Sequence, residues 1–504
     1  MLFSSRAGSA ALGLALTLAL SLTAVAPAAR AGTPDLGQQL RDLTQVALDS
    51  EFKACKSING KLTKAIADPQ FEQLSPDMRG VALYVAIFCA PEKSDQAVTA
   101  ARRLVKLPVD PRLLYGGQLA LIQDAYKREA PADYVAALDA IIEADPTLVA
   151  DWKPEDVYWI LRKVKDDPAL EGVLLDHLHA VPWTHADARE TDANGWAVRR
   201  ARRLLEAGDA AKARAVLDGV TSTSQLLIVA QDRRFEPLWP QLQAEGRFDW
   251  IKLVQAELAA HQDRIKAEPT LLEPVTQALG DLWALERYDD AVALGDAYAA
   301  RLRKGDIFTD AKEQRSWLLN QLAQVYYALG RFDAADALMV EATGEDPVSQ
   351  AINRSEMLDG AGRPAEALKL LQAIDGKKAS DYGQMWQISG QACVKFDLGD
   401  KAAADTLIAA MRPRWKDNAD ALGAALLCVG ADDELAALYV RRLNDPIERA
   451  GVLAQFRNTR PARVEAPVYA RREAHRRAII ARPEVVAALS HWGRPLDLPL
   501  SGNF

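Results

Sequence analysis

The sequence predicts an all-α fold, a solenoid of antiparallel helix pairs, and two observations support this. Through most of the chain apolar residues recur at three- and four-residue spacing, the period of one helix face, while the alternating β-branched runs typical of strands are scarce. A short motif also returns, in which a glycine or a substitute precedes a charge and often an aromatic residue. It stands at 246–249 (GRFD), 286–289 (ERYD), 330–333 (GRFD), 362–365 (GRPA) and 399–402 (GDKA). The alternative is an irregular all-helical protein.

The segment 322–347, LAQVYYALGRFDAADALMVEATGEDP, shows what the motif does. Apolar residues with the helix period precede Gly330 and resume after it. Gly330 can adopt the left-handed conformation that ends a helix at little steric cost, and Pro347 lacks the amide hydrogen that would continue the second helix. Ala323 and Ala335, one on each side of the turn, let the two helices approach closely. The segment therefore predicts a helical hairpin.

The same pattern of a turn residue between two amphipathic helices recurs along the chain. Including Gly330, we expect hairpin turns at Gly208, Gly246, Glu286, Gly330, Gly362 and Gly399. The residue five positions after each turn is small in all cases but one: Ala213, Ile251, Ala291, Ala335, Ala367 and Ala404. Upstream of about residue 190 the pattern fades into ordinary amphipathic helices.

The segment 322–347 resembles the tetratricopeptide repeat (TPR) family. The family pattern of small, aromatic, glycine and proline positions is met in order by Leu322, Ala323, Tyr326, Gly330, Phe332, Ala335, Met339, Ala342 and Pro347. The repeats around Gly362 and Gly399 match less completely, and the turns are 32 to 44 residues apart, a looser spacing than the usual ~34. The resemblance implies a right-handed solenoid of TPR-like hairpins that binds proteins.

The first residues predict export. Arg6 precedes a long uncharged apolar run, and Ala29–Arg30–Ala31 fits the rule for signal-peptide cleavage. We expect a periplasmic or secreted mature chain that begins at Gly32. An uncleaved anchor is the alternative, because the run approaches the ~20 residues that span a bilayer. The expected organisation is a signal peptide (1–31), divergent helical repeats (32–190), TPR-like repeats (191–445) and a basic C-terminal helical cap (446–504).

The four cysteines are spaced in repeat-length pairs. Cys55 and Cys89 are 34 residues apart, and Cys393 and Cys428 are 35 apart. In a solenoid each repeat touches only its neighbours, so we expect each pair to form a disulfide bond between the first helices of adjacent repeats. Export supplies the oxidising compartment that such bonds need. Four buried free thiols are the alternative. Metal ligation is not expected, because no Cys-x-x-Cys spacing occurs.

Composition and motifs give little support to catalysis or nucleic-acid binding. The net charge of −8 lacks the basic excess expected of a nucleic-acid-binding protein. No phosphate-binding glycine loop, His-Glu-x-x-His motif or nucleophile elbow is present, and we expect no cofactor. His177, His179 and His185 are close in sequence, but residues two apart do not share a helix face, so surface or capping roles are favoured over a metal site.

Arginines gather near the C-terminus. They are Arg457, Arg460, Arg463, Arg471, Arg472, Arg476, Arg477, Arg482 and Arg494, and only Glu465, Glu473 and Glu484 oppose them between residues 457 and 494. Guanidinium groups suit carboxylates and phosphates, so an anionic partner is one hypothesis. A solvated capping helix is the favoured alternative, because repeat arrays need polar ends.

The resemblance to the TPR family also implies where a partner docks, since first-helix side chains line the concave face. The corresponding positions are Trp317, Asn320, Gln324, Tyr327, Trp386, Ser389 and Phe396. Aromatic anchors mixed with short polar groups suit a protein or an extended peptide. The alternative is that the two tryptophans fill gaps between repeats.

Two functions remain open at this point. The first is a non-enzymatic scaffold for protein–protein interaction in the bacterial envelope. The second is a helical solenoid that assists, or forms part of, an enzyme acting on peptidoglycan or polysaccharide. A deep pocket with paired acids in unlike environments would favour the second function over the first.

Overall fold

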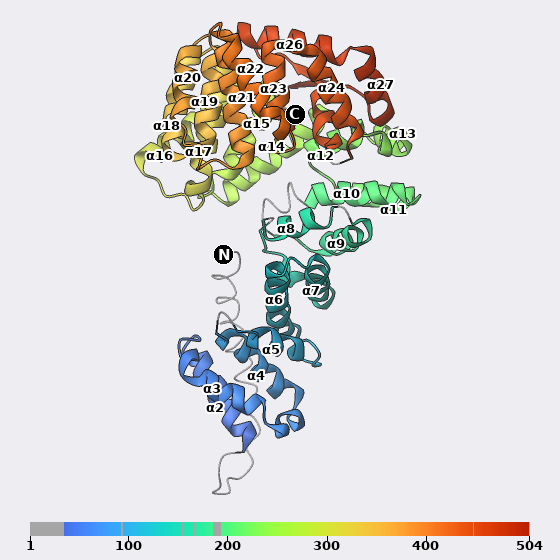
Figure 1. Ribbon diagram of the computed structural model, residues 1–504, viewed down its shortest axis with the longest axis vertical. Coiled ribbons are helices and arrows are strands. Elements are labelled where there is room, and N and C mark those ends of the chain that lie inside the picture. Colours follow the sequence, from blue (N-terminus) through green and yellow to red (C-terminus); the bar gives the residue numbers. More distant parts are fainter. Residues whose placement is uncertain are drawn as a thin grey trace. The chain divides into compact units, whose positions relative to one another are not determined.

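The computed structural model describes residues 35–91, 94–153, 155–165, 167–184, 193–446 and 448–502. The predicted signal peptide and His185 lie outside these residues. The chain forms two compact units: unit 1 comprises Met1–Arg203 with Ala215–Gly219, and unit 2 comprises Leu204–Arg214 with Val220–Phe504. Both units consist almost entirely of antiparallel helices, which confirms the all-α prediction (Figure 1). Among the described residues, none of the helices combines the length and the apolar character required to cross a membrane.

Unit 1 is a series of helix hairpins. The pairs are α2 (Leu36–Asp49) with α3 (Cys55–Ile66), α4 (Pro76–Cys89) with α5 (Gln96–Leu104), α6 (Pro111–Lys127) with α7 (Pro131–Ala144), and α8 (Glu155–Lys163) with α9 (Pro168–Ala180). Short 3₁₀ turns occur at Pro69–Gln73 and Pro146–Val149. Several helices begin at a proline preceded by an aspartate or serine whose side chain accepts a bond from the first-turn backbone, an arrangement that supports helix initiation. Residues of α10 (Ala193–Glu206) and α11 (Ala210–Asp218) belong to both units.

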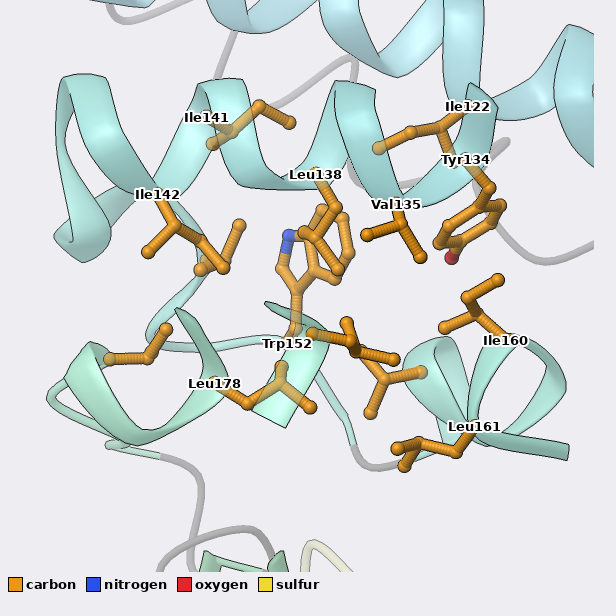
Figure 2. Packing of buried hydrophobic residues seen from close by; sticks show 14 of the residues in the cluster. Ile122, Tyr134, Val135, Leu138, Ile141, Ile142, Trp152, Ile160, Leu161 and Leu178 are labelled. Atoms are coloured by element: carbon orange, nitrogen blue, oxygen red, sulfur yellow. The ribbon is translucent and has the colours of Figure 1, made fainter. Parts of the chain in front are cut away.

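The core of unit 1 is apolar and aromatic. Tyr134, Leu138 and Ile141 on α7 face Trp152 and Leu178 across the space between the helices (Figure 2). These side chains are at most 5% exposed. The polar ends of the rings are satisfied, since the Tyr134 hydroxyl donates to the Asp156 carbonyl and the Trp152 indole donates to the Tyr115 hydroxyl. Apolar burial of this kind is the main stabilising contribution to such a unit.

Unit 2 contains the hairpins that the sequence identified. Its helices are α12 (Thr223–Gln231), α13 (Trp239–Ala244), α14 (Trp250–Ala267), α15 (Glu273–Ala284), α16 (Tyr288–Lys304), α17 (Ala311–Ala328), α18 (Phe332–Glu345), α19 (Ser349–Gly360), α20 (Pro364–Ala373), α21 (Asp381–Asp397), α22 (Lys401–Met411), α23 (Ala419–Val429), α24 (Asp432–Asn444) and α25 (Arg449–Leu453). A 3₁₀ turn, Arg233–Leu238, joins α12 to α13, and shorter ones follow α22 and α25.

All six predicted hairpin turns are present. Each turn residue has a left-handed backbone, with φ between 59° at Glu286 and 88° at Gly399. The alanines five positions later are no more than 1% exposed, as close helix contact requires, and Ile251 is half-buried. A further turn of the same kind, at Gly430 between α23 and α24, was not predicted. The position five residues after it holds the fully buried Leu435, so the small-residue pattern does not reveal this turn.

Both predicted disulfides are formed. Cys393 on α21 and Cys428 on α23 join the first helices of adjacent hairpins, with Cα atoms 5.3 Å apart. Cys55 and Cys89 are also paired, with Cα atoms 4.7 Å apart, but their placement differs from the prediction. Cys55 begins α3 and Cys89 ends α4, so this bond joins a second helix to the next first helix. It is possible there because consecutive helices run antiparallel and bring those two ends together.

The C-terminal residues are not only helical. After α25 the chain forms β1 (Arg457–Arg460), α26 (Pro467–Ile480), α27 (Pro483–Trp492) and β2 (Leu496–Ser501), and the two short strands pair in parallel. The sequence did not predict these strands. They are four and six residues long, and β1 consists of polar residues without an apolar alternation. Leu498 and Leu500 of β2 are buried, so this pair belongs to the folded core of unit 2.

Candidate functional site

The first helices of the hairpins in unit 2 form one layer. Helices α15, α17, α19, α21 and α23 each contact the next one in the series, and we call their shared surface the first-helix face (Figure 1). The second helices α16, α18, α20, α22 and α24 pack against these partners. The residues carried over from the TPR resemblance all lie on α17 and α21, two helices of this layer.

Trp317 and Trp386 occupy equivalent positions on the first-helix face. Each stands 13 residues before the turn glycine of its hairpin, Gly330 or Gly399. Trp317 is 43% exposed, whereas Trp386 is half-buried against the core around α23. The two tryptophans therefore differ. Trp317 presents its ring to solvent, while Trp386 contributes partly to packing, which was the alternative considered from the sequence.

Asn320 and Ser389 do not reach the surface. They are 4% and 2% exposed, so a ligand cannot contact either side chain in this conformation, and their predicted binding role is corrected. The physical reason is that this position of each first helix packs inside the hairpin layer. Asn320 Oδ1 has no hydrogen-bond partner in the described part of the chain, which is costly for a buried acceptor. Gln324 is half-buried and keeps partial access to the face.

Tyr327 and Phe396 lie near the turn ends of their helices. Phe396 is half-buried, and Lys401 Nζ lies 5.6 Å from the centre of its ring. Tyr327 makes an edge contact with Tyr469 of α26, with ring centres 5.9 Å apart. Burial, followed by the nearby carboxylates of Glu356 and Asp359, raises the pKa of Tyr327 well above its ordinary value. Tyr327 is therefore half-buried, with one edge of its ring against the C-terminal residues of its own chain, which limits its access to a partner.

Tyr382 is an exposed aromatic residue that the sequence reasoning missed. It lies at the start of α21, four residues before Trp386 and thus on the same side of the helix, and it is 57% exposed. The available signal was this four-residue spacing in DYGQMW. With Trp317 and the half-buried Gln324, Tyr382 belongs to the part of the first-helix face that α26 does not cover, which we call the open half.

Helix α26 lies across the C-terminal ends of the first helices (Figure 1). Arg472 bonds to both Asp359, at the end of α19, and Asp397, at the end of α21, with N–O distances of 2.6 and 2.8 Å. Arg471 also bonds to Asp397, at 3.0 Å. The C-terminus of a helix carries partial negative charge, so arginines are favoured there even before the carboxylates are counted. This explains the basic composition of α26.

Most C-terminal arginines have partners inside unit 2. Arg457 bonds to Gln231, Arg460 to Glu286, Arg476 and Arg477 to Glu473, Arg482 to Asp433 and Glu484, and Arg494 to the Ala230 carbonyl. The basic segment therefore lies along several repeats of its own unit rather than only at the end of the array. These bonds account for much of the positive charge for which an anionic partner was hypothesised.

Two of the described histidines, His177 and His261, each lie beside a carboxylate, and His261 Nδ1 is 2.6 Å from Asp281. His177 Nε2 lies 3.9 Å from Glu143, and burial lowers the pKa of His179. No group of three or more possible metal ligands occurs among the residues that the structure describes. A hollow of about 340 Å³ between α14, α15 and α16 is lined mainly by apolar atoms, and its Arg287 and Asp290 bond to each other. This hollow has one acid in its lining, Asp290, and so lacks the paired acids that the second function would need. Outside it, Asp139 and Glu143 lie beside His177, and burial raises the pKa of Asp139 to about 6.

Comparison with known proteins gives a structural likeness only. No family model matches the sequence, and the comparison with curated proteins gives no match. The crystal structure of yeast Tom70 is 12% identical, covers 90% of this chain and 99% of its own, and has a TM-score of 0.33. The APC/C hetero-tetramer Cut9-Hcn1 is 12% identical, with coverages of 94% and 98% and a TM-score of 0.29. Scores this low carry no argument, so the TPR-like description of unit 2 rests on its own hairpins and turns.

Proposed function

We propose that this chain is a non-enzymatic scaffold of the bacterial envelope that binds a protein or an extended peptide on the open half of the first-helix face. The observation that carries the proposal is the exposure of Trp317. A tryptophan side chain buries a large apolar area when it is covered, so an exposed one on a repeat surface is a natural anchor for a partner. Its 43% exposure leaves much of that area uncovered in the folded chain.

The surroundings of Trp317 suit an extended peptide. Gln324 lies about two helical turns further along α17, and its amide can both donate to and accept from a peptide backbone. Tyr382 and Trp386 supply further aromatic surface on α21. Aromatic anchors beside amide groups are a common composition of protein-binding surfaces.

Two acids at this face are engaged in structural ion pairs, which favours binding over catalysis at those positions. Asp359 and Asp397 both bond to Arg472, so their charges are used in structural ion pairs. A general acid and base need separate environments that drive their pKa values apart and leave both groups free for a substrate. The export part of the proposal is supported by the predicted signal peptide and by the two disulfides, which persist in oxidising compartments.

The proposal is tested by capture from an envelope extract, with quantitative mass spectrometry of bound proteins. We expect the variants Trp317→Ala and Tyr382→Ala to lose the same partner, because both remove exposed rings of the open half. Val340→Ala is the matched control, since Val340 is 51% exposed but lies on the second helix α18. Equal capture by all variants at unchanged thermal stability would contradict the proposal.

A further inference from the structure

The turn-side half of the first-helix face is already occupied by the chain itself. Residues 461–480, α26 with the segment that precedes it, run past the ends of α17, α19 and α21 and form what we call the strap. The Val464 amide donates to the Ala328 carbonyl at 2.9 Å, and the Tyr469 hydroxyl donates to the Glu356 carbonyl at 3.1 Å. Both bonds are to backbone groups of the first helices, which the strap thus contacts much as a bound peptide does.

Two glycines of the repeats are shaped to receive the strap. A Cβ added to Gly330 would lie 2.9 Å from Cγ1 of Val464. A Cβ added to Gly360 would collide with the Tyr327 hydroxyl and lie 2.6 Å from Cε2 of Tyr469. Gly360 is the last residue of α19 and does not have a positive φ, so its backbone does not require glycine. Glycine is needed at position 360 because the rings of Tyr327 and Tyr469 occupy the space that a side chain would fill.

The strap is firmly attached at its ends but lightly along its middle. At one end the preceding strand β1 pairs with β2, and at the other Ile479, Val485 and Leu489 are buried against the core around α24. Between Val468 and Ala478 every residue is half-buried or exposed. This middle section is attached by polar contacts rather than by apolar core packing: ion pairs of Arg471 and Arg472, the Tyr469 hydroxyl bond to the Glu356 carbonyl, and the Arg476 bond to Asn458. The Arg471 side chain is 61% exposed, whereas the Arg472 side chain is 13% exposed. The exposed Arg471 pair should contribute little and weaken in salt, so the Arg472 pairs carry most of the electrostatic attachment.

We propose that the strap is a releasable, arginine-rich occupant of the turn-side half of the first-helix face. Its middle lifts while β1 and α27 stay in place, and this uncovers Tyr327, Asp359 and Asp397. The row of helix ends binds an arginine-rich helix, which α26 supplies from the same chain. The consequence for a partner rests on the proposed function. If a partner binds the open half, release of the strap would extend its binding surface toward Tyr327.

Hydrogen exchange of the full chain tests the release directly. We expect the backbone amides of 468–478 to exchange by local opening, faster than those of Leu435–Leu443 in α24, most of whose side chains are buried in the core. The double variant Arg471→Gln/Arg472→Gln should accelerate exchange of the strap about tenfold and leave α24 unchanged, because charge-assisted bonds are lost only at the strap. Arg477→Gln is the matched control, since Arg477 bonds to Glu473 of the same helix.

A peptide added in trans provides the second measurement. Fluorescence anisotropy with a labelled peptide of residues 466–481 should show salt-sensitive binding to the Arg471→Gln/Arg472→Gln chain and much weaker binding to the intact chain. Adding Asp359→Asn and Asp397→Asn should abolish it. The inference is overturned if the strap exchanges only together with α24, or if the loosened chain does not bind the peptide. Neither measurement uses an external partner. The release of the strap can therefore be confirmed or refuted even if no partner binds the open half.

Discussion

Units 1 and 2 build the same helix hairpin with different turn chemistry. In unit 2 the left-handed turn residues are glycines, apart from Glu286. In the described part of unit 1 they are Glu51, Phe52 and Glu129, which carry side chains in a conformation that glycine adopts more readily. The hairpin therefore does not depend on glycine. Where another residue stands at the turn, a further interaction accompanies it.

Those accompanying interactions can be identified. Phe52 packs on Phe88 with ring centres 5.2 Å apart, directly beside the Cys55–Cys89 disulfide. Glu286 accepts bonds from Ser501 and Arg460, so the one non-glycine turn residue among the predicted set also attaches the C-terminal strands. Turn residues with side chains thus serve as attachment points, whereas glycine turns leave their surroundings open or receive another segment.

The two units also differ in the size of the residue that is buried inside the hairpin. Five residues after the turn at Glu129, unit 1 places Tyr134, which is 1% exposed, whereas unit 2 places Ala335 at the equivalent position after Gly330. One hairpin is closed around a ring and the other is closed by contact between small residues. Substitutions at these two positions should therefore fail for opposite reasons.

The largest expected effect is that of Tyr134→Ala. It leaves a cavity in the core of unit 1 and removes the bond to the Asp156 carbonyl, so the free energy of unfolding should fall by about 3–5 kcal/mol. Urea denaturation of the full chain, followed by a probe in unit 1, measures this. A loss below about 1 kcal/mol would show that the hairpin can collapse around the missing ring.

Removing either disulfide should cost up to about 4 kcal/mol, because both close loops of similar length and constrain the unfolded chain equally. The variants are Cys55→Ser/Cys89→Ser and Cys393→Ser/Cys428→Ser, measured by thermal unfolding under non-reducing conditions. A much larger effect in unit 1 would mean that this bond also supports the strained turn at Glu51 and Phe52. No effect of either pair would contradict both assignments.

Ala335→Leu should destabilise unit 2 by about 1–3 kcal/mol through overpacking, since no space exists between α17 and α18 for a larger side chain. Ile251→Leu is the control, because Ile251 is half-buried at the corresponding position after Gly246 and should tolerate the change. An unchanged melting temperature for Ala335→Leu would argue against close helix contact at this hairpin.

The smallest expected effect concerns pH. Burial raises the pKa of Asp139 on α7 to about 6, against the opposing charge of His177. Because the folded pKa lies above the unfolded one, this group's favourable contribution is present at about pH 4 and is lost as the pH rises through 6. Asp139→Asn should therefore stabilise unit 1 at pH 7.5 and flatten its stability between pH 4.5 and 7.5, as followed by urea midpoints. A variant less stable than the parent at pH 7.5 would contradict this.

The sequence predicted the hairpins of unit 2 better than those of unit 1, because the two units use different turn residues. Glycine turns followed by small residues are visible as a pattern, and they located the six hairpin turns. The disulfide pairs, one in each unit, were located by the repeat-length spacing of the cysteines. The hairpins of unit 1 pass through Glu51 and Glu129, residues with no turn signature, so only general amphipathicity was detectable. The Gly430 turn was hidden because Leu435 replaces the small residue.

The candidate site was predicted in part. The resemblance to the TPR family assigned Trp317 and Trp386 to first helices, and they lie at equivalent positions on α17 and α21. A position on a helix does not give depth, and Asn320 and Ser389 are buried. Coverage of Tyr327 by Tyr469 joins residues 142 positions apart. No local pattern encodes such a contact. The arginines of α26 suggested an outside partner because their acceptors, Asp359 on α19 and Asp397 on α21, lie 74 to 113 residues away in sequence.

The central claim, that a partner docks on the open half of the first-helix face, is tested most directly by site-specific photo-crosslinking in an envelope extract. A photoreactive phenylalanine analogue would replace Trp317, Tyr382 or, as the control, Val340. We predict one shared crosslinked protein from positions 317 and 382 and none from position 340. Crosslinks from position 340 alone, or none from either position of the open half, would contradict it.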